Sequence, residues 1–449
     1  MEEVRLDTIL LELRAALEHD DLAQAVALIE GLRPPDQAEV FADLTDDHQI
    51  ALLPELQPED SADILEKLDE ANAAEIADTL SAEALARIVD EMEPDEAADL
   101  LGDIAPDHAQ NTLAEMTDPD EIHPLLLHAD NTAGGLMTSE FLALRRRMSA
   151  AEALAAIRAW KPDSKVAYHL FVVDAYDKLC GVVNLRQIII AEPATPIADI
   201  MDPEVITAQA DLDQEETAQL MRHYDLLALP VIDANRKLLG VVTIDDVVDV
   251  LVEEAAEDIQ RFGGAAPLER SYLDNPVVAV MRKRINWLLL LFLTESLTGT
   301  VLRHFEGELQ SVVALSFFVP LLIGTGGNAG SQTTSTIIRA LALGDVEWSD
   351  ILRAFWHELR VGLLLGAGMA LIAYLRALTW GSSSDMAVTV AVAIFTIVIW
   401  ANGLGALLPL AATRLKIDPT VVSGPVMSTL VDATGLFIYF TIARLVMGL

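Results

Sequence analysis

The first part of the chain repeats a pattern of polar turns and apolar positions every twelve residues. In each unit a polar or proline-containing turn comes first, and apolar residues follow six and ten positions after its start, such as Ile64 and Leu68. Apolar residues four apart lie on one face of a helix, and proline suits a helix's first turn. The pattern predicts a superhelix of short stacked helices, with units starting at Pro34, Asp46, Pro58, Glu70, Ala82, Pro94, Pro106 and Asp118.

Residues 132–257 have a strand-like pattern that occurs twice. Phe171–Asp174 followed by Gly181 matches Leu229–Asp233 followed by Gly240, with an offset of 59 residues. Each copy has an apolar strand, a polar turn, a glycine, a second apolar strand and then a helix. We therefore expect two similar α/β units, and a connecting helix that leaves the second and continues to about residue 270.

Apolar stretches dominate the rest of the chain, and each is long enough to cross the hydrocarbon core of a membrane, which takes ~20 residues. The predicted fold class is a multi-domain membrane protein. It has an all-α superhelical N-terminal domain at 1–131, α/β units at 132–198 and 199–257, the connecting helix, and a five-helix transmembrane domain at 271–449. The expected spans are about 285–302, 310–341, 354–378, 387–411 and 420–446.

Charge separates the two halves. From Ser271 onward the chain has 11 Asp and Glu and 11 Lys and Arg, so the whole net charge of −41 lies on residues 1–270. A surface this acidic repels nucleic acid and anionic lipid headgroups and attracts cations. Cys180 is alone, which argues against a disulfide framework or a cysteine zinc site. The histidines have no nucleophile or metal-site spacing, so we expect no enzyme.

Basic residues mark the expected orientation in the membrane. The positive-inside rule places the N-terminus in the cytoplasm and the C-terminus outside, since one set of span ends carries Arg282, Lys283, Arg284, Arg339, Arg353, Arg414 and Lys416, and the other carries Arg303 and Arg376. The charged start of the chain has no apolar signal region. We expect a multi-pass protein of the cell (inner) membrane.

Asp432 is the most informative single residue, because it places a carboxylate inside the last apolar stretch. An acid at membrane depth is costly unless it faces water, a cation or a buried partner. The glycine-rich run from Pro320 to Gln332 predicts a broken helix that lines a cavity, and Asp418 stands at the membrane edge. We interpret these features as an ion pathway. A purely structural pairing of Asp432 with Arg or hydroxyl groups is the alternative.

Mg²⁺ prefers oxygen ligands and releases its water reluctantly, so a pore for this ion should hold it in a largely hydrated form. One Asp432 per chain supplies too little charge, but a symmetric homodimer would bring two together on its axis. Glu295 in the first span either lines the path or forms a hydrogen bond to another helix, and we favour the hydrogen bond.

Two resemblances sharpen these expectations. The repeated α/β units resemble a tandem of cystathionine-β-synthase (CBS) domains, in which a Ser/Thr and an Asp three residues later hold a nucleotide. The second unit keeps this pattern in Thr243 and Asp246, whereas the first has Asn184 and Gln187 instead. The resemblance implies ATP at one cleft of the CBS pair, held by Thr243 and Asp246.

The order of domains resembles the MgtE family of magnesium channels. So do the glycine-rich run, Asp418-Pro419, Ser423-Gly-Pro425 and Asp432-Ala-Thr-Gly435. The resemblance implies a homodimeric Mg²⁺ influx channel that cytosolic Mg²⁺ closes when it binds between the acidic domains and the connecting helices. The metal-binding residues that it implies are Asp432, Asp418, Asp258, Glu257, Glu254, Asp249, Asp246, Asp225, Glu215, Asp213, Asp99, Asp95, Asp63 and Gly135.

Two other functions remain open. One is a Na⁺- or H⁺-coupled divalent cation transporter regulated by nucleotide at the CBS pair, although five spans do not divide into equal inverted halves. The other is a nucleotide sensor with a membrane anchor, which would not need Asp432. The sequence does not fix the preference for Mg²⁺ over Mn²⁺, Co²⁺ or Ca²⁺, or the Mg²⁺ level that closes the pore.

Overall fold

The structure is a computed structural model that describes residues 2–160, 169–268, 272–273, 275–422 and 424–449. Ser271 and Ser423, which the sequence analysis used as a domain start and as part of a motif, lie outside these ranges. The chain forms two compact units, the N-terminal unit up to Glu254 and the C-terminal unit from Ala255 onward. Each unit is described by itself.

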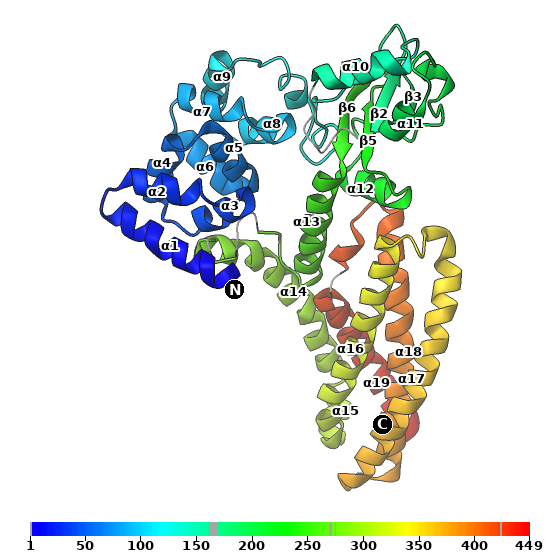
Figure 1. The fold of residues 1–449 in the computed structure, drawn as a ribbon. Helices are drawn as coiled ribbons and strands as arrows, with labels where there is room; N and C mark the ends of the chain where they lie inside the picture. Colours follow the sequence, from blue (N-terminus) through cyan, green and yellow to red (C-terminus); the bar gives the residue numbers. More distant parts are fainter. Residues whose placement is uncertain (1, 161–168, 269–271, 274, 423) are drawn as a thin grey trace. The chain divides into compact units, whose positions relative to one another are not determined.

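The helical domain opens the N-terminal unit (Figure 1). Its helices pack mainly against the second helix along the chain, as α3 does on α5 and α6 on α8, which is the contact pattern of a superhelix. The helices are α1 (Glu2–Glu18), α2 (Leu22–Ile29), α3 (Pro34–Ala42), α4 (Asp46–Leu52), α5 (Pro58–Lys67), α6 (Glu70–Thr79), α7 (Ala82–Val89), α8 (Pro94–Asp103) and α9 (Pro106–Glu115), with the short 3₁₀ helices η1 (Leu53–Glu55) and η2 (Leu125–Leu127).

The twelve-residue pattern predicted where these helices begin. The starts of α3 to α9 fall on the first residues of seven expected units, from Pro34 to Pro106. The eighth expectation was wrong, because no helix starts at Asp118. Pro124 lies six residues later, lacks an N–H and restricts the residue before it, so a helix there would be interrupted before its second turn ended.

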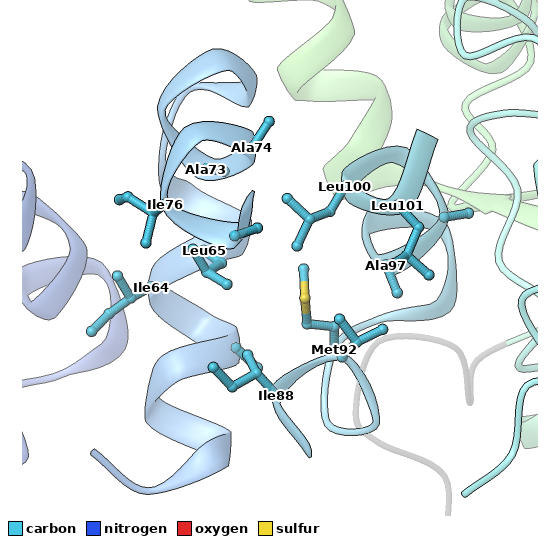
Figure 2. Close-up of a cluster of buried hydrophobic side chains, with 14 of the residues drawn as sticks. Ile64, Leu65, Ala73, Ala74, Ile76, Ile88, Met92, Ala97, Leu100 and Leu101 are labelled. Carbon is cyan, nitrogen blue, oxygen red and sulfur yellow. The ribbon is translucent and has the colours of Figure 1, made fainter. Parts of the chain in front are cut away.

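Buried side chains at the repeated positions form the core of the helical domain. Ile64, Ile76 and Ile88 are 0%, 4% and 3% exposed, so the repeated position is buried in each of these units. Figure 2 shows Leu65 and Leu100 meeting Met92 between neighbouring helices. Each helix is too short to be stable alone, so its stability comes from this packing.

Two three-stranded sheets follow, with the same topology. In each, the first two strands are parallel and the last two antiparallel, and Val172 pairs with Gly181 as Val231 pairs with Gly240, which confirms the expected repeat. The elements are β1 (Ala143–Arg145), α10 (Ala150–Trp160), β2 (His169–Val173), β3 (Leu179–Asn184), α11 (Leu185–Ile190) and η3 (Ile197–Asp199), then β4 (Ala208–Gln209), α12 (Gln214–His223), β5 (Ala228–Ile232) and β6 (Leu238–Thr243).

The two α/β units exchange their leading segments. Thr138, which precedes the first unit's strands, bridges to Val241 of β6, and Asp202, which precedes the second unit's strands, bridges to Val182 of β3. This exchange ties the units into a pair.

The connecting helix α13 (Ile244–Phe262) leaves β6 directly, as expected. It ends at Phe262 rather than near residue 270, because the backbone turns through Gly264, whose φ is +74°. Residues up to Glu254 belong to the N-terminal unit, and the remainder belongs to the C-terminal unit.

The C-terminal unit is helical. At its centre α18 packs against α16, α17 and α19, and Figure 1 shows these helices running side by side in yellow, orange and red. The helices are α14 (Val277–His304), α15 (Glu306–Ser311), α16 (Ala314–Ala342), η4 (Trp348–Asp350), α17 (Ile351–Thr379), α18 (Ser384–Arg414), η5 (Pro419–Val421) and α19 (Gly424–Met447).

Four helices in the described residues are long and apolar enough to cross a membrane: α14, α17 with η4, α18 and α19. The fifth expected span corresponds to α16, which has 29 residues but is not among the four. Its middle part contains a run from Gly324 to Thr334 that is made of Gly, Ala, Ser, Thr, Asn and Gln and has no large apolar residue.

The expected break in the glycine-rich run was wrong. Helix α16 continues through Pro320 and all of its glycines. These glycines allow close helix packing, as small residues do in membranes. A Cβ on Gly326 would lie 2.5 Å from Ile397 Cγ2, and one on Gly405 of α18 would lie 2.7 Å from the carbonyl oxygen of Gly330.

Candidate functional site: an acidic cavity and a membrane carboxylate

An acidic cavity of about 250 Å³ lies in the N-terminal unit. The first turns of α6 and α8, the turn after η2 and the exposed side of α13 all contribute carboxylates to it. Its lining residues are Glu70, Asp95, Glu96, Asp99, Asp130, Asn131, Leu136, Gln214, Asp246, Asp249, Val250 and Glu253.

Crowding and burial make these carboxylates hold protons more tightly than usual. Burial, reinforced by the charge of Asp130, raises the pKa of Asp99 to about 8. Burial and the charge of Glu66 raise the pKa of Glu96 to about 7. Burial and the charge of Asp246 raise the pKa of Asp95 well above its usual value. Protons or cations that neutralise these carboxylates would therefore stabilise the cavity.

Asp95 shows that this cavity suits a cation. The residue is 5% exposed, and its Oδ1 atom has no hydrogen-bond partner in the described part of the chain. A buried carboxylate oxygen without a partner is costly. The donors around it are oxygens, which hard cations such as Mg²⁺ prefer.

Direct and water-mediated binding of a cation place different demands on the acidic cavity. Among the described residues, no group of three or more His, Cys, Asp or Glu side chains is placed to hold a metal ion directly. Carboxylates can still bind a hydrated ion by accepting hydrogen bonds from its water molecules, and Mg²⁺ commonly keeps several waters.

Four predicted residues line this cavity, namely Asp95, Asp99, Asp246 and Asp249. Four further acids were missed in the list of metal ligands: Glu70, Glu96, Asp130 and Glu253. Two signals in the sequence could have found Glu70 and Glu96. Glu70 starts a twelve-residue unit two units before Pro94, and the structure packs α6 on α8. Glu96 follows Asp95 directly in the first turn of α8.

Other predicted residues lie outside the lining of the acidic cavity. Glu254 accepts a hydrogen bond from Gln214 Nε2 at 2.7 Å, which links it to the cavity wall. Gly135 packs beneath the turn that carries Asp130, since a Cβ there would lie 2.4 Å from the Asp130 carbonyl oxygen. The remaining ones have other surroundings: Asp63 is half-buried on α5, Asp213 caps α12, Glu215 bonds Gln219, and Asp225 is exposed.

Three predicted residues belong to the C-terminal unit beside the end of α13. Arg261 forms ion pairs with Glu257 and with Asp418, the latter at 2.7 Å. Burial alone would raise the pKa of Asp418, but hydrogen bonds from Thr420 and Arg261 outweigh burial and lower it. Asp258 lies on the same turn of α13. Asp418 is thus held as a charged group that ties α13 to the segment before α19.

Asp432 lies half-buried in the middle of α19, which is a candidate membrane helix. It makes no hydrogen bond or ion pair with any described residue, so the pairing with Arg or hydroxyl groups is not found there. Close packing surrounds it, because Gly327 of α16 lies against Ser428 one turn earlier and Ser331 donates to the Gly424 carbonyl at 3.2 Å.

Glu295 on α14 is exposed and interacts with Asp432 through charge repulsion. The hydrogen bond that we favoured for Glu295 is not present among the described residues. Two carboxylates that repel each other are stabilised by a shared cation.

The nucleotide candidates differ between the two α/β units. Thr243 donates a hydrogen bond to Asp246 Oδ2 at 2.6 Å, so the pair is in contact. Asn184 and Gln187 instead cap the start of α11 reciprocally, which occupies both side chains. Asp246 also lines the acidic cavity, so one carboxylate belongs to both candidate sites.

Comparison with known proteins identifies each part. Family models match residues 32–126 as an MgtE intracellular N domain, residues 133–193 and 197–253 as CBS domains, and residues 319–442 as an MgtE divalent cation transporter. The magnesium transporter MgtE of Thermus thermophilus is 42% identical over 338 residues, 75% of each chain. That of Bacillus subtilis is 32% identical over 329 residues, 73% of this chain and 72% of its own.

Solved structures agree with this assignment. The crystal structure of the cytosolic domain of the Mg²⁺ channel MgtE in complex with ATP is 34% identical, with a TM-score of 0.51, and the match covers 54% of this chain and 99% of that one. The identity and coverage of the curated relatives extend well beyond the CBS pair, which many unrelated proteins carry. The chain therefore belongs to the MgtE family of magnesium transporters.

Proposed function

We propose that this protein is a homodimeric Mg²⁺ channel for influx across the cell membrane, closed by cytosolic Mg²⁺. The observation that carries the proposal concerns Asp432. This acid is half-buried in a candidate membrane helix and makes no hydrogen bond or ion pair with any residue that the structure describes. Such an acid persists where it meets a cation or a water-filled path. In a symmetric dimer two Asp432 side chains would face one hydrated ion.

The acidic cavity would act as the sensor. Without Mg²⁺, its crowded carboxylates repel one another and favour separation of α13 from α6 and α8. Bound Mg²⁺ would neutralise them and hold these helices together. A change from mostly open to mostly closed needs about 5 kcal/mol of differential binding, which several weak sites can supply together.

The end of α13 would couple Mg²⁺ binding in the acidic cavity to the closing of the pore. Arg261 links α13 to Asp418, only a few residues before the start of α19 at Gly424. A displacement of α13 would therefore act on the segment that leads to Asp432. The basic residues at the ends of α14, α16, α17 and α18 favour an N-terminus in the cytoplasm.

The decisive experiment is Mg²⁺ influx into proteoliposomes at low and high Mg²⁺ on the cytosolic face. The wild type should conduct at low Mg²⁺ and stop at high Mg²⁺, and Asp432→Ala should lose influx under both conditions. The matched control is Asp385→Asn, an exposed acid in the first turn of α18, which should conduct as the wild type does. Equal influx in the wild type and Asp432→Ala would refute the assignment of the pore.

Coupled transport is the alternative, and the same liposomes separate the two. A channel conducts Mg²⁺ down its own gradient in the absence of any Na⁺ or H⁺ gradient. Influx that requires such a gradient would replace the channel with a transporter in which Asp432 binds ion and proton alternately.

A nucleotide is a second candidate ligand, favoured by the contact between Thr243 and Asp246 and by the related cytosolic domain in complex with ATP. ATP would bind one cleft of the CBS pair. Thr243→Ala should weaken ATP binding in equilibrium dialysis, whereas Asn184→Ala should leave it unchanged because Asn184 caps α11.

A further inference from the structure

A cavity of about 550 Å³ lies in the C-terminal unit, apart from Asp432. The end of α13, the turn after it, the first turns of α14 and the residue Val421 enclose it. Its lining residues are Arg261, Gly264, Ala265, Ala266, Pro267, Ala279, Arg282, Lys283, Asn286, Trp287 and Val421. We refer to it as the cationic cavity.

The chemistry of the cationic cavity is amphipathic. Alanine, proline and valine side chains form most of its wall, while Arg282 and Lys283 bring positive charge from α14. Arg261 adds a third basic side chain, which pairs with Glu257 and Asp418. Acidic and basic residues are equal in number from Ser271 onward, so these adjacent basic residues form a local concentration of positive charge over an apolar wall. Their charge is complementary to an anion that carries an apolar tail.

Trp287 supplies a hydrogen-bond donor beside this wall. Its indole Nε1 is buried and has no acceptor among the described residues. Gly264 makes room for the ring, since a Cβ there would lie 2.3 Å from Nε1, and its φ of +74° also favours glycine. A buried donor without an acceptor is costly, so an acceptor oxygen from a ligand would relieve it.

The location of the cationic cavity identifies the source of its ligand. It lies at the start of α14, a candidate membrane helix whose next turns expose Leu288, Leu289 and Phe292 at 57%, 54% and 75%. Tryptophan and basic residues at the end of a membrane helix lie at the level of the lipid headgroups. Lipid is therefore the amphipathic anion that is present at this depth.

We propose that the cationic cavity binds an anionic phospholipid, with its phosphate at Arg282 and Lys283 and its glycerol and first acyl carbons along Ala266, Pro267 and Ala279. Basic pockets on the cytoplasmic side of membrane helices recognise lipid headgroups in this way. The bound lipid would join the turn at Gly264–Pro267 to α14. This site shares Arg261 with the proposed link between α13 and the pore, but its lining includes neither Asp432 nor any residue of the acidic cavity.

Native mass spectrometry of the full-length protein in detergent tests this site, with phosphatidylglycerol and phosphatidylcholine of identical acyl chains as probes. The wild type should bind phosphatidylglycerol about tenfold more tightly than it binds phosphatidylcholine. The double variant Arg282→Gln/Lys283→Gln should lose this preference, and the charge-preserving variant Arg282→Lys/Lys283→Arg should keep it. Arg284→Gln is the matched control, because Arg284 is exposed on the same turn but does not line the cavity.

A neutral variant tests the apolar wall separately. Ala279→Phe should fill the cavity and reduce binding of phosphatidylglycerol without changing any charge. If Arg284→Gln lost as much of the preference for phosphatidylglycerol as the double variant, the proposal would be overturned. The attraction of the lipid would then come from the basic surface in general and not from the cationic cavity. Displacement of the lipid by millimolar glycerol phosphate would also overturn it in favour of a soluble anion. So would unchanged lipid binding in Ala279→Phe.

Discussion

In the N-terminal unit eight carboxylates line one cavity of about 250 Å³, whereas in the C-terminal unit Asp432 stands in α19 without a hydrogen-bond partner in the described structure. Crowded acids raise one another's pKa values and respond to any neutralising ion, so under the proposed function their state would depend on the Mg²⁺ concentration. Asp432 has no acidic neighbour on its own helix, and Glu295 of α14 is the acid that repels it. The crowded group fits the proposed sensor, and the carboxylate within a membrane helix fits the proposed pore.

Packing differs between the two units in a related way. The helical domain is held by buried apolar side chains such as Ile64 and Ile76, which fill the space between its helices. The C-terminal unit is held by glycine contacts between α16, α18 and α19, in which backbone meets backbone or side chain at close range. These different cores fit the proposed functions, in which the sensor would open and the pore would keep its dimensions.

The largest expected effect separates sensing from permeation. The triple variant Asp95→Asn/Glu96→Gln/Asp99→Asn removes three carboxyl groups from the acidic cavity, so closure should require at least about tenfold more cytosolic Mg²⁺. Its influx at low Mg²⁺ should equal that of the wild type, because Asp432 is intact. Influx into proteoliposomes over a series of Mg²⁺ concentrations measures both quantities. Glu83→Gln, an exposed acid on α7, is the control and should change neither. Wild-type inhibition in the triple variant would show that this cavity is not the sensor.

A glycine substitution compares the two kinds of core. Gly405→Ala would place a Cβ 2.7 Å from the backbone carbonyl oxygen of Gly330, which cannot move easily, so we expect a loss of roughly 1–3 kcal/mol of stability. Gly102→Ala in α8 meets nothing within 4 Å and should stabilise the helix by up to about 1 kcal/mol. Thermal unfolding of each variant in detergent measures the difference. If both variants behaved alike, close glycine packing would not distinguish the C-terminal unit.

The sequence predicted well where the helices of the N-terminal domain begin, but it predicted poorly which side chains come together in the acidic cavity. The twelve-residue pattern located the starts of α3 to α9, because each helix start depends on nearby proline, acidic and apolar residues. The acidic cavity depends on how far the superhelix turns between α6 and α8, which no local pattern specifies. Glu70 and Glu96 could have been suspected from the sequence, but their meeting with Asp130 at one cavity could not be predicted for that reason.

In the C-terminal unit a local pattern led to a wrong prediction. The glycine-rich run of α16 suggested a broken helix, since glycine has a low helix propensity in water. The structure keeps α16 continuous because its glycines are packed against α18 and α19, and packing outweighs propensity there. Asp432 could be identified without any knowledge of helix packing, because an acid within an apolar stretch is visible in the sequence itself.

Protons should compete with Mg²⁺ in the acidic cavity. Burial and mutual repulsion raise the pKa of Glu96 to about 7 and that of Asp99 to about 8, while unfolding returns both to about 4. Between these values the folded state holds more protons, so the free energy of unfolding of the Mg²⁺-free protein falls as pH rises from about 4 to about 8. Mg²⁺ binding should release protons at pH 7. Titration calorimetry in two buffers of different ionisation enthalpy measures that release, and its absence, or an equal release from the triple variant, would contradict this prediction.

The smallest expected effect concerns Arg261, which joins the two kinds of site. Its ion pair with Asp418 is partly exposed, with side-chain exposures of 41% and 31%, so its contribution to stability should be at most about 1 kcal/mol. Arg261→Gln should therefore fold normally but leave Asp418 held by Thr420 alone, and closure by Mg²⁺ should weaken about two- to fivefold. If the pair acts as a unit, Asp418→Asn should weaken closure equally, and the double variant should add nothing further. Additive effects would mean that α13 acts on α19 through other contacts. Arg87→Gln is the control, because Arg87 is an exposed base in the last turn of α7 that does not line the acidic cavity.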